Sequence, residues 1–528
     1  MEWEHGSTAL YDEREKLISN RGSVQRYLSC IASQLNVNAT NRMVLGFRTH
    51  SRSNPGQSFL SLKPSFTVGH SLHHLINRAM DADELIAEKR RARAAKKSEK
   101  QKVNISGQPN QQQAGHSPQM YLARKLKSVG ITVNQSEQNH NNLAGGKTLK
   151  IMTWNILAQC LVRRTLFPGS DFLKWKDRGS AITREILHYD PDVICLQEVD
   201  RLPDHGPVLN KAGFDYTHVI GGYEEDGKQH GLLIGWKRDL LNLSRKDVIR
   251  LDEQQFQSRH GLSRVTRNVA LNCALAFNHH SGGLIIGTAH LFWHARFAYE
   301  RVRQTGFLAK AICEFSMTNE DTAKWPVFIA GDLNEEPGGP SYRLLSGAEM
   351  SEREKLIVNE SCLVHKSVDQ LFDQASRQYV TFEGDEDRVF KDVRQAETVD
   401  GLFDLEELRS IYGPWSWSSL YGTWGAKMPD EENNRFKDRL DQRQEPASIL
   451  SSDFDIKVGK YEPMWTNFTP LWRCTLDYIW LLNNGSNVHV VSLLPTHRTE
   501  LLEPGLPRLG VEPSDHIALM AEIMIGPE

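Results

Sequence analysis

Residues 149–155 read Leu-Lys-Ile-Met-Thr-Trp-Asn, a short apolar run that ends on a side-chain amide. Its length and composition predict a β-strand with Asn155 at its end. Val193–Leu196 is a second short run of the same kind. Between the two, apolar residues recur on one face from Ala181 to His188, which predicts a helix, and Asp190-Pro191-Asp192 ends it. This stretch therefore indicates an α/β fold.

The same features recur downstream. We expect a helix at 299–315, and further strands at 232–236, 269–276, 284–289, 327–330, 476–482, 488–493 and 517–525. Several of these strands follow one another without a helix between them, so the order is not a simple β-α-β alternation. Two packed sheets flanked by helices fit this order better.

Polar residues are unevenly distributed along the chain. Of the 528 residues, 39% are hydrophobic, and the formal net charge is −3. Residues 1–145 are rich in Ser, Asn, Gln, Lys and Arg and lack sustained apolar periodicity, so we expect a mostly disordered polar and basic extension. Residues 146–528 should form the folded domain, with a polar insertion at about 346–460.

Cysteine usage and apolar runs exclude several protein classes. The seven cysteines are scattered and form no Cys-x-x-Cys pair, which argues against a disulfide framework or a zinc site. No apolar run approaches the ~18–20 residues of a membrane span, and the N-terminus lacks the pattern of a secretory signal. We therefore expect an intracellular protein of the cytoplasm, the nucleus or both, with no membrane partner.

Polar side chains stand where the predicted strands begin or end. They are Asn155, Glu198, His290, Asp332, Asn334, Asp477, Asp515 and His516. Such positions tend to converge at one rim of a sheet, where pockets form. Carboxylate and amide oxygens suit Mg²⁺ or Mn²⁺ rather than zinc, and the histidines add capacity for proton transfer. This set suits attack of water on a phosphodiester.

Six ordered stretches carry a resemblance to a known family. They are Thr153-Trp154-Asn155-Ile156-Leu157, Leu196-Gln197-Glu198-Val199, Thr288-Ala289-His290-Leu291, Gly331-Asp332-Leu333-Asn334-Glu335-Glu336-Pro337, Leu476-Asp477-Tyr478-Ile479 and Ser514-Asp515-His516. In this order they resemble the motifs of the endonuclease/exonuclease/phosphatase superfamily, the exonuclease III/DNase I-like hydrolases, over residues ~147–528. The resemblance implies a four-layer α-β-β-α sandwich of two packed mixed β-sheets flanked by helices.

Further stretches resemble one branch of this superfamily. Trp293 after His290, the Thr466–Thr469 segment before Asp477, and the Ser419-x-Tyr421 element are similar to the carbon-catabolite-repression-type deadenylases, nocturnin and Angel proteins. In layout the chain is closest to the fungal Ngl-type RNA exonucleases. The implied activity is that of an RNA-directed 3′-exonuclease.

The resemblance also implies which residues bind the metal and activate water. Glu198 would be the main metal carboxylate, Asn155 a neighbouring metal or phosphate contact, and Asp515 would lie near the metal. Asp332 would orient or deprotonate the attacking water, helped by Asn334. In an alternative two-metal arrangement, Asp332 and Asn334 would instead be ligands of a second ion.

Other residues would contact the substrate. His516 would donate a hydrogen bond to the scissile phosphate, and Asp477 would hold its imidazole. His290 would contact the phosphate or the leaving oxygen. Asn268 resembles a polar loop residue that faces the phosphate, and Trp293 is a candidate for substrate binding.

Simpler structural explanations exist for several of these residues. Asp332 and Asn334 are turn formers, and Trp293 can serve packing alone. His230, before a predicted strand, stands where relatives often carry another residue, and we leave it outside the predicted site.

The function expected from the sequence is a Mg²⁺-dependent 3′-to-5′ exoribonuclease (Mn²⁺ is an alternative ion) that releases 5′-nucleotides. Its substrates would be RNA 3′ ends, with poly(A) tails and precursor ribosomal RNA among them, as in deadenylation and mRNA decay. One alternative is the same chemistry on a small phosphoester, such as the 2′-phosphate of NADPH or a phosphoinositide. Another is a catalytically inactive binding module. No protein partner can be read from the sequence.

Overall fold

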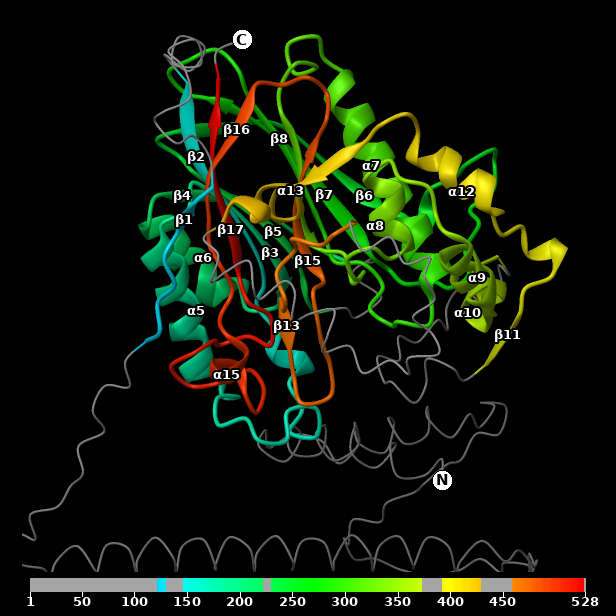
Figure 1. Ribbon diagram of the computed structural model, residues 1–528, viewed down its shortest axis with the longest axis horizontal. Helices are drawn as coiled ribbons and strands as arrows, with labels where there is room; N and C mark the ends of the chain where they lie inside the picture. The colour runs from blue at the N-terminus through cyan, green and yellow to red at the C-terminus, as the bar shows by residue number, and fades with distance from the viewer. Residues whose placement is uncertain (1–120, 130–145, 222–228, 373–391, 429–457, 527–528) are drawn as a thin grey trace, which may run out of the picture. The chain divides into compact units, whose positions relative to one another are not determined.

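Two mixed β-sheets packed face to face form the centre of the structure, a computed structural model in which residues 121–129, 146–221, 229–372, 392–428 and 458–526 are described (Figure 1). These residues all fall within one compact unit, Ala114–Glu528. None of the helices in the described ranges is both long enough and apolar enough to span a bilayer.

The first sheet has seven strands in the order β1-β16-β17-β2-β3-β5-β4. Their bounds are β1 Lys127–Ser128, β2 Lys147–Asn155, β3 Val193–Val199, β4 Phe214–Ile220, β5 Gly231–Lys237, β16 Val488–Leu493 and β17 Leu519–Ile525. Its one parallel pair, β2 with β3, is joined by a crossover that contains α5 (Trp175–Tyr189). The remaining pairs in this sheet are antiparallel.

The second sheet has six strands in the order β12-β15-β9-β8-β7-β6. Their bounds are β6 Leu241–Arg250, β7 Val269–Phe277, β8 Gly283–Ala289, β9 Val327–Asp332, β12 Trp417–Ser419 and β15 Asp477–Leu482. Its parallel pair, β8 with β9, is joined through α7 (Ala298–Met317). Each sheet thus contains one β-α-β unit inside an otherwise antiparallel order, which is why the strand order read from the sequence is irregular.

Shorter elements complete the described chain. The helices are α6 Leu202–Lys211, α8 Pro340–Leu345, α9 Glu352–Glu360, α10 Lys366–Phe372, α12 Leu405–Tyr412, α13 Leu420–Trp424 and α15 Thr499–Leu502. The 3₁₀ turns are η1 Gln159–Leu161, η3 Leu251–Glu253, η5 Thr398–Asp400 and η6 Gly425–Lys427. Two small two-stranded antiparallel sheets pair β10 Leu363–His365 with β11 Val393–Gln395, and β13 Asn467–Phe468 with β14 Arg473–Cys474.

Three apolar layers bury the sheets on both faces. Successive residues of β2 point to opposite faces, so Ile151 enters the core between the sheets while Met152 packs against α5. The third layer lies between the second sheet and α7, α8 and α12. Figure 1 shows α5 and α6 on one side and α7, α8 and α12 on the other. The expected four-layer α-β-β-α sandwich of two mixed sheets is confirmed.

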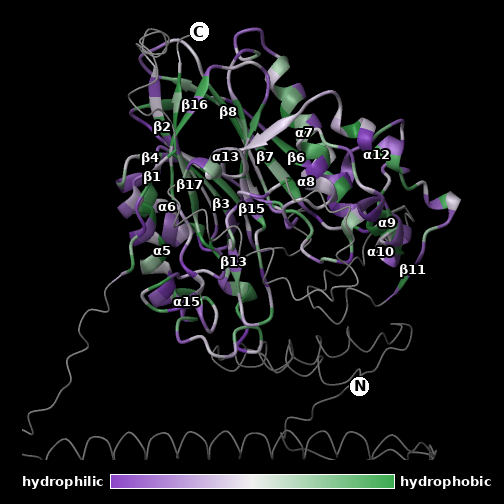
Figure 2. Ribbon diagram, in the orientation of Figure 1, coloured by the Kyte–Doolittle hydropathy of each residue, from purple (hydrophilic) through white to green (hydrophobic). Residues whose placement is uncertain are grey.

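Burial on both faces explains why the central strands were readable from the sequence. Strands β3, β5 and β8 are near-continuous apolar runs, and Figure 2 shows the hydrophobic colouring concentrated in the strands at the centre. Strands β4 and β6 were not predicted. Both lie at sheet edges and have only two fully buried residues each, so their sequences are more polar than those of the central strands.

The segment 121–129 belongs to the folded body, although the boundary expected from composition falls later, at residue 146. Val129 is buried, and the two-residue strand β1 pairs antiparallel with β16 at the edge of the first sheet. The rest of the expected N-terminal extension, 1–120 and 130–145, lies outside the described residues.

The polar insertion expected at 346–460 is partly built into the fold. Its residues 373–391 and 429–457 lie outside the described ranges. The described part supplies β12, an edge strand of the second sheet, and α12, whose buried face packs on α7.

Candidate active site

Side chains of chemical interest gather where strands of both sheets begin or end. Asn155 ends β2 and lies beside Gln197 of β3, whereas Asp332 ends β9 and lies opposite Asp477, the first residue of β15. The Asn155 side-chain amide donates to Asp332 Oδ2 at 3.0 Å and to Glu198 Oε1 at 3.1 Å. This one amide therefore holds a carboxylate of each sheet.

A β-bulge in β3 aims Glu198 into the site. Along β3 the pairing passes from Leu196, opposite Leu233, to Val199, opposite Gly231, so β3 has one residue more than β5 over this interval. Glu198 itself has φ 60°, in the left-handed region that a glutamate rarely adopts. Bulges redirect side chains beside active sites, and a strained residue held by its surroundings is typical of such positions.

The Glu198 carboxylate is held in its charged form. Its Oε2 accepts a hydrogen bond from the backbone N–H of Ala158 at 2.8 Å, and its Oε1 lies 3.9 Å from His290 Nδ1. Burial would raise the pKa of Glu198, but His290, His230 and these hydrogen bonds together hold the pKa below its ordinary value. The ring centroids of His230 and His290 are 6.5 Å apart, so the structure brings His230, left outside the sequence prediction, to the edge of the site.

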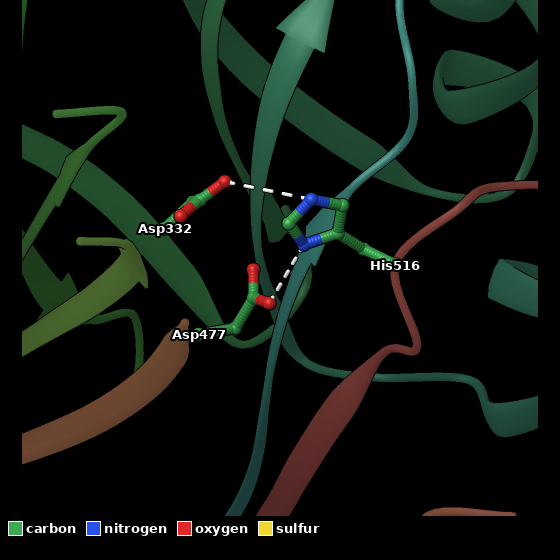
Figure 3. A group of neighbouring side chains, drawn as sticks. All are labelled: Asp332, Asp477 and His516. Atoms are coloured by element: carbon green, nitrogen blue, oxygen red, sulfur yellow. Dashed lines mark hydrogen bonds and ion pairs between the residues drawn. The ribbon is translucent and has the colours of Figure 1, made fainter. Parts of the chain in front are cut away.

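A second carboxylate pair holds His516 (Figure 3). His516 Nδ1 is 2.8 Å from Asp477 Oδ2, and its Nε2 is 3.7 Å from Asp332 Oδ2. Burial alone would lower the pKa of His516, but the charges of Asp477 and Asp332 outweigh it and place the pKa well above its ordinary value. These charges favour the protonated imidazole, whose Nε2 faces Asp332.

His290 faces the same carboxylate from the second sheet. It follows β8 and forms a parallel bridge with Asp332, and its Nε2 is 3.5 Å from Asp332 Oδ2. Asp332 Oδ2 is thus approached by Asn155, His290 and His516. Its other oxygen accepts the backbone N–H of Asn334 at 2.9 Å, which fixes the carboxylate plane.

A buried glutamine links the two sheets beneath these residues. Gln197 Nε2 donates to Thr153 Oγ1 at 3.1 Å and to Thr288 Oγ1 of the other sheet at 2.9 Å. Because a buried amide must find partners, this bridge fixes the spacing of the sheets next to Asn155 and Glu198.

Arg178 of α5 was missed by the sequence analysis. It is buried, and its guanidinium donates to Pro513 O at 2.6 Å, to Ile156 O and Leu157 O at 2.7 Å each, and to Gln159 Oε1 at 2.9 Å. The loop after Asn155 is thereby tied to the loop before His516. A signal was present: Arg178 lies on the helix face that also carries the buried apolar residues of α5.

The predicted site residues divide into two groups. The structure brings together Asn155, Glu198, His290, Asp332, Asp477, Asp515 and His516. Asp515 is half-buried, and burial raises its pKa, as does the charge of Glu198.

The side chains of the remaining predicted residues make their contacts elsewhere. Asn334 adopts φ 50° and donates its side-chain amide to Leu291 O at 2.9 Å, so the side chain organises the turn. The Asn268 amide donates to Gln304 of α7 at 3.3 Å. Trp293 is 39% exposed, with its ring 5.0 Å from that of His294.

The donor set fits a hard divalent cation. Asp332, Asp477 and His516 lie close enough together to share an ion, but His516 is already bound to Asp477 and carries a proton, so it is a poor ligand. The carboxylates of Glu198 and Asp332 provide oxygens instead, the donors that Mg²⁺ prefers. The Asn155 Nδ2 group joins the two carboxylates, while its Oδ1 accepts the Leu157 N–H at 3.1 Å. Asp477 Oδ1 is buried without a hydrogen-bond partner among the described residues, which leaves it able to accept one.

Comparisons with known proteins agree with the motif order. A model of the Endonuclease/Exonuclease/phosphatase family matches residues 152–516. A probable RNA exonuclease of Schizosaccharomyces pombe is 28% identical over 406 residues, which cover 71% of this chain and 76% of that protein. RNA exonuclease NGL2 of Saccharomyces cerevisiae is 28% identical over 436 residues, covering 72% of this chain and 78% of its own. The CCR4-Not complex 3′-5′-exoribonuclease subunit Ccr4 of Aspergillus oryzae is 25% identical, covering 72% of this chain and 48% of its own.

Proposed function

The chain belongs to the endonuclease/exonuclease/phosphatase family, and from this membership we propose that it is a Mg²⁺-dependent exoribonuclease that removes 5′-nucleotides from RNA 3′ ends. One observation carries the chemistry: the Asn155 amide joins the Glu198 and Asp332 carboxylates beside the Asp477–His516 pair. The choice of RNA is supported by relatives from two yeasts that bear the name RNA exonuclease. The 3′-to-5′ direction is supported by the name of the Aspergillus relative.

The metal would be held by Glu198, with Asn155 beside it and Asp515 in the adjacent loop, which leaves Asp332 for the attacking water. A Mg²⁺ ion in such a site would supply charge stabilisation to the phosphate oxygens. The charged state of Glu198 favours binding of a cation at neutral pH. Mn²⁺ has the same preference for oxygen and would serve in its place.

The protein's own side chains would handle the proton. Asp332 Oδ2 lies close to the side chains of Asn155, His290 and His516. It would orient the attacking water and accept its proton. His516, held as an imidazolium by Asp477, would donate a hydrogen bond to a non-bridging phosphate oxygen as negative charge develops there. His290 would contact the phosphate or the leaving oxygen from the opposite sheet.

The substrate strand would lie beyond this cluster. Trp293 presents an exposed ring three residues after His290, which suits stacking on a base, and Asn268 would contact a phosphate from its loop. The proposed substrates are RNA 3′ ends, poly(A) tails among them, which places the enzyme in the cytoplasm, the nucleus or both. We assign catalysis to residues 146–528 together with the packed segment 121–129.

A substrate panel tests this function. The full chain is incubated with 5′-labelled oligo(A), a mixed-sequence RNA, the same RNA with a blocked 3′ end, NADPH and inositol phosphates, each with Mg²⁺ or with EDTA. We expect a ladder that shortens the unblocked RNAs from the 3′ end and yields nucleoside 5′-monophosphates. EDTA and Glu198→Gln should abolish the ladder.

Each other result has a definite meaning. Phosphate release from NADPH or an inositol phosphate, without cleavage of RNA, would replace the proposal by a small-phosphoester hydrolase. Internal cleavage of the blocked RNA would make the enzyme an endonuclease. No metal-dependent turnover of any substrate would leave only a binding role.

A further inference from the structure

Arg124 contacts the segment that carries His516, and it lies outside the part of the chain that matches the family model, residues 152–516. Its segment, 121–129, lies along the edge of the first sheet. Leu122 N donates to Gly510 O at 3.1 Å, and Val129 N donates to Val491 O at 3.1 Å. The segment thus runs beside β16 and the loop that precedes His516.

The guanidinium of Arg124 is buried and grips both ends of the segment 512–518. Nη1 donates to Ala518 O at 2.7 Å, and Nη2 lies 3.4 Å from Glu512 Oε1. Nη2 also donates to Glu185 Oε1 of α5 at 2.9 Å. Glu512 and Ala518 bracket Ser514, Asp515 and His516, so one side chain spans the catalytic turn.

Arg178 holds the same segment from the other direction. It donates to Pro513 O at 2.6 Å from a position two turns before Glu185 on α5. Within the segment, His516 N donates to Ser514 Oγ at 3.2 Å, and His516 O accepts from Trp154 Nε1 at 3.0 Å. The segment 512–516 has no regular secondary structure apart from isolated bridges at Glu512 and His516. Its conformation therefore depends on these side-chain bonds together with a few backbone bonds, such as Phe468 N to Asp515 O at 3.0 Å and Ile517 N to Thr466 O at 2.7 Å.

The charges around Arg124 make it costly to remove. Glu185 and Glu512 are both buried and share this arginine, and His497 Nε2 lies 3.1 Å from Glu512 Oε1. Loss of the arginine would leave two carboxylates buried without their main cation, and the chain would relieve this by moving or by admitting water. The mobile partner in that adjustment is the loop side, 512–518, since Glu185 is fixed within a helix.

We propose that Arg124 is a positioning residue for the catalytic turn: by binding Glu512, Ala518 and Glu185 together, it sets where His516 stands relative to Asp477 and Asp332. Its effect on turnover rests on the proposed function, whereas its effect on the turn itself does not. A displacement of ~1 Å at a reacting group can cost ~10²-fold in rate, so even a modest relaxation of this turn would be measurable.

The test compares full-length Arg124→Met and Arg124→Lys with Arg343→Met. Arg343 is a matched control, since it is also buried and paired with a buried glutamate, Glu354 at 3.0 Å, but it lies on α8. Backbone amide exchange is measured in EDTA, and RNA cleavage is measured with Mg²⁺ at a temperature where circular dichroism shows each variant folded.

In Arg124→Met we expect the backbone amide hydrogens of residues 512–518 to exchange at least ~10-fold faster than in the wild type. We also expect kcat to fall at least ~10-fold, while KM stays within about twofold of the wild-type value. Arg124→Lys keeps the charge but cannot make the same forked contacts, so it should fall between Arg124→Met and the wild type. Arg343→Met should alter neither exchange at 512–518 nor kcat, even if its melting temperature falls.

The proposal is overturned if folded Arg124→Met, or folded Arg124→Lys where the first variant does not fold, keeps wild-type exchange at 512–518. It is also overturned if exchange rises while kcat stays at the wild-type value. If the wild type cleaves no RNA, the proposed function fails, and the exchange measurement still decides whether Arg124 holds the turn.

Discussion

Asp332 and Asp477 are positioned by a β-ladder, whereas His516, which lies close to both, is held by an isolated bridge to Asn467 and by side chains. The two aspartates face each other in the pairing of β9 with β15, and Leu333 N donates to Leu476 O at 3.0 Å just beyond them. His516 lies in a turn whose anchors include two buried arginines from distant parts of the chain. Many backbone hydrogen bonds fix the position of a residue in a ladder, so the loss of one side chain changes that position little. A turn held by a few side chains can be displaced by a substitution at one residue.

The largest effect should come from the ladder-held carboxylate. Asp332→Asn keeps the size of the side chain and the ladder but removes the charge that would face the cation and the water. We expect RNA cleavage to fall by about 10³-fold or more, while the melting temperature of the metal-free protein changes little. A steady-state assay and calorimetry check this. Activity within ~10-fold of the wild type would remove Asp332 from the proposed chemistry.

Asp477→Asn tests the link between the two regions. The pKa of His516 lies well above its ordinary value because Asp477 and Asp332 stabilise the imidazolium, so removing one charge should lower it. Activity that needs the protonated form is lost as pH rises through that pKa, and the alkaline limb of the kcat profile should therefore move to lower pH. We expect a loss of about 10²-fold at pH 8, measured from pH 6 to 10. An unshifted limb would contradict the imidazolium assignment.

Arg178→Met probes the side-chain-held region alone. Four hydrogen bonds to the loops at 156–159 and 513 are lost, while the Asp332–Asp477 ladder stays intact. We expect kcat to fall by about tenfold and the free energy of unfolding to fall by roughly 2–4 kcal/mol. Arg343→Met, with a comparable loss of stability, should leave kcat unchanged. Equal kcat in the two variants would show that the turn does not depend on Arg178.

The smallest expected effect is on the pH dependence of the free energy of unfolding. Burial raises the pKa of Glu185 to about 8 and that of Glu512 to about 7, so the folded protein holds a proton that the unfolded chain releases. This stabilisation is fully present below the ordinary carboxyl pKa and is lost as pH rises through about 8. Arg124 is the cation that faces the pair, with His497 and Tyr121 nearby.

Glu185→Gln should flatten this dependence. Between pH 5.5 and 8.5 the wild type should lose about 1–3 kcal/mol more of its free energy of unfolding than the variant, measured by urea denaturation in EDTA. Glu512 would keep Arg124 and His497 as its charged neighbours. The same slope in both proteins would mean that no proton is shared at this site.

Much of the fold could be predicted from the sequence because strands that are buried on both faces are continuous apolar runs. The runs at 149–155 and 193–196 became β2 and β3 with their ends extended by two or three residues, and the helix expected at 299–315 became α7. Edge strands β4 and β6 escaped because half of their side chains face water. The segment 121–129 escaped because it mixes apolar with basic residues and forms only the two-residue strand β1, which is too short to give a strand pattern.

The candidate site divides in a similar way. The carboxylates and histidines at strand ends could be named because each motif keeps its residues close in sequence. That His230 stands beside His290, and that Asn334 organises a turn, could not be read, since both depend on which loops meet.

The sequence by itself determined the chemical inventory, because strand patterns and the polar residues that flank them are local properties of the chain. Only the tertiary structure decided how that inventory is held: the bulge that aims Glu198, the amide that joins two sheets, and the arginines that span the turn before β17. These depend on contacts between residues up to 394 positions apart, and the burial that makes such contacts strong does not exist until the layers have packed.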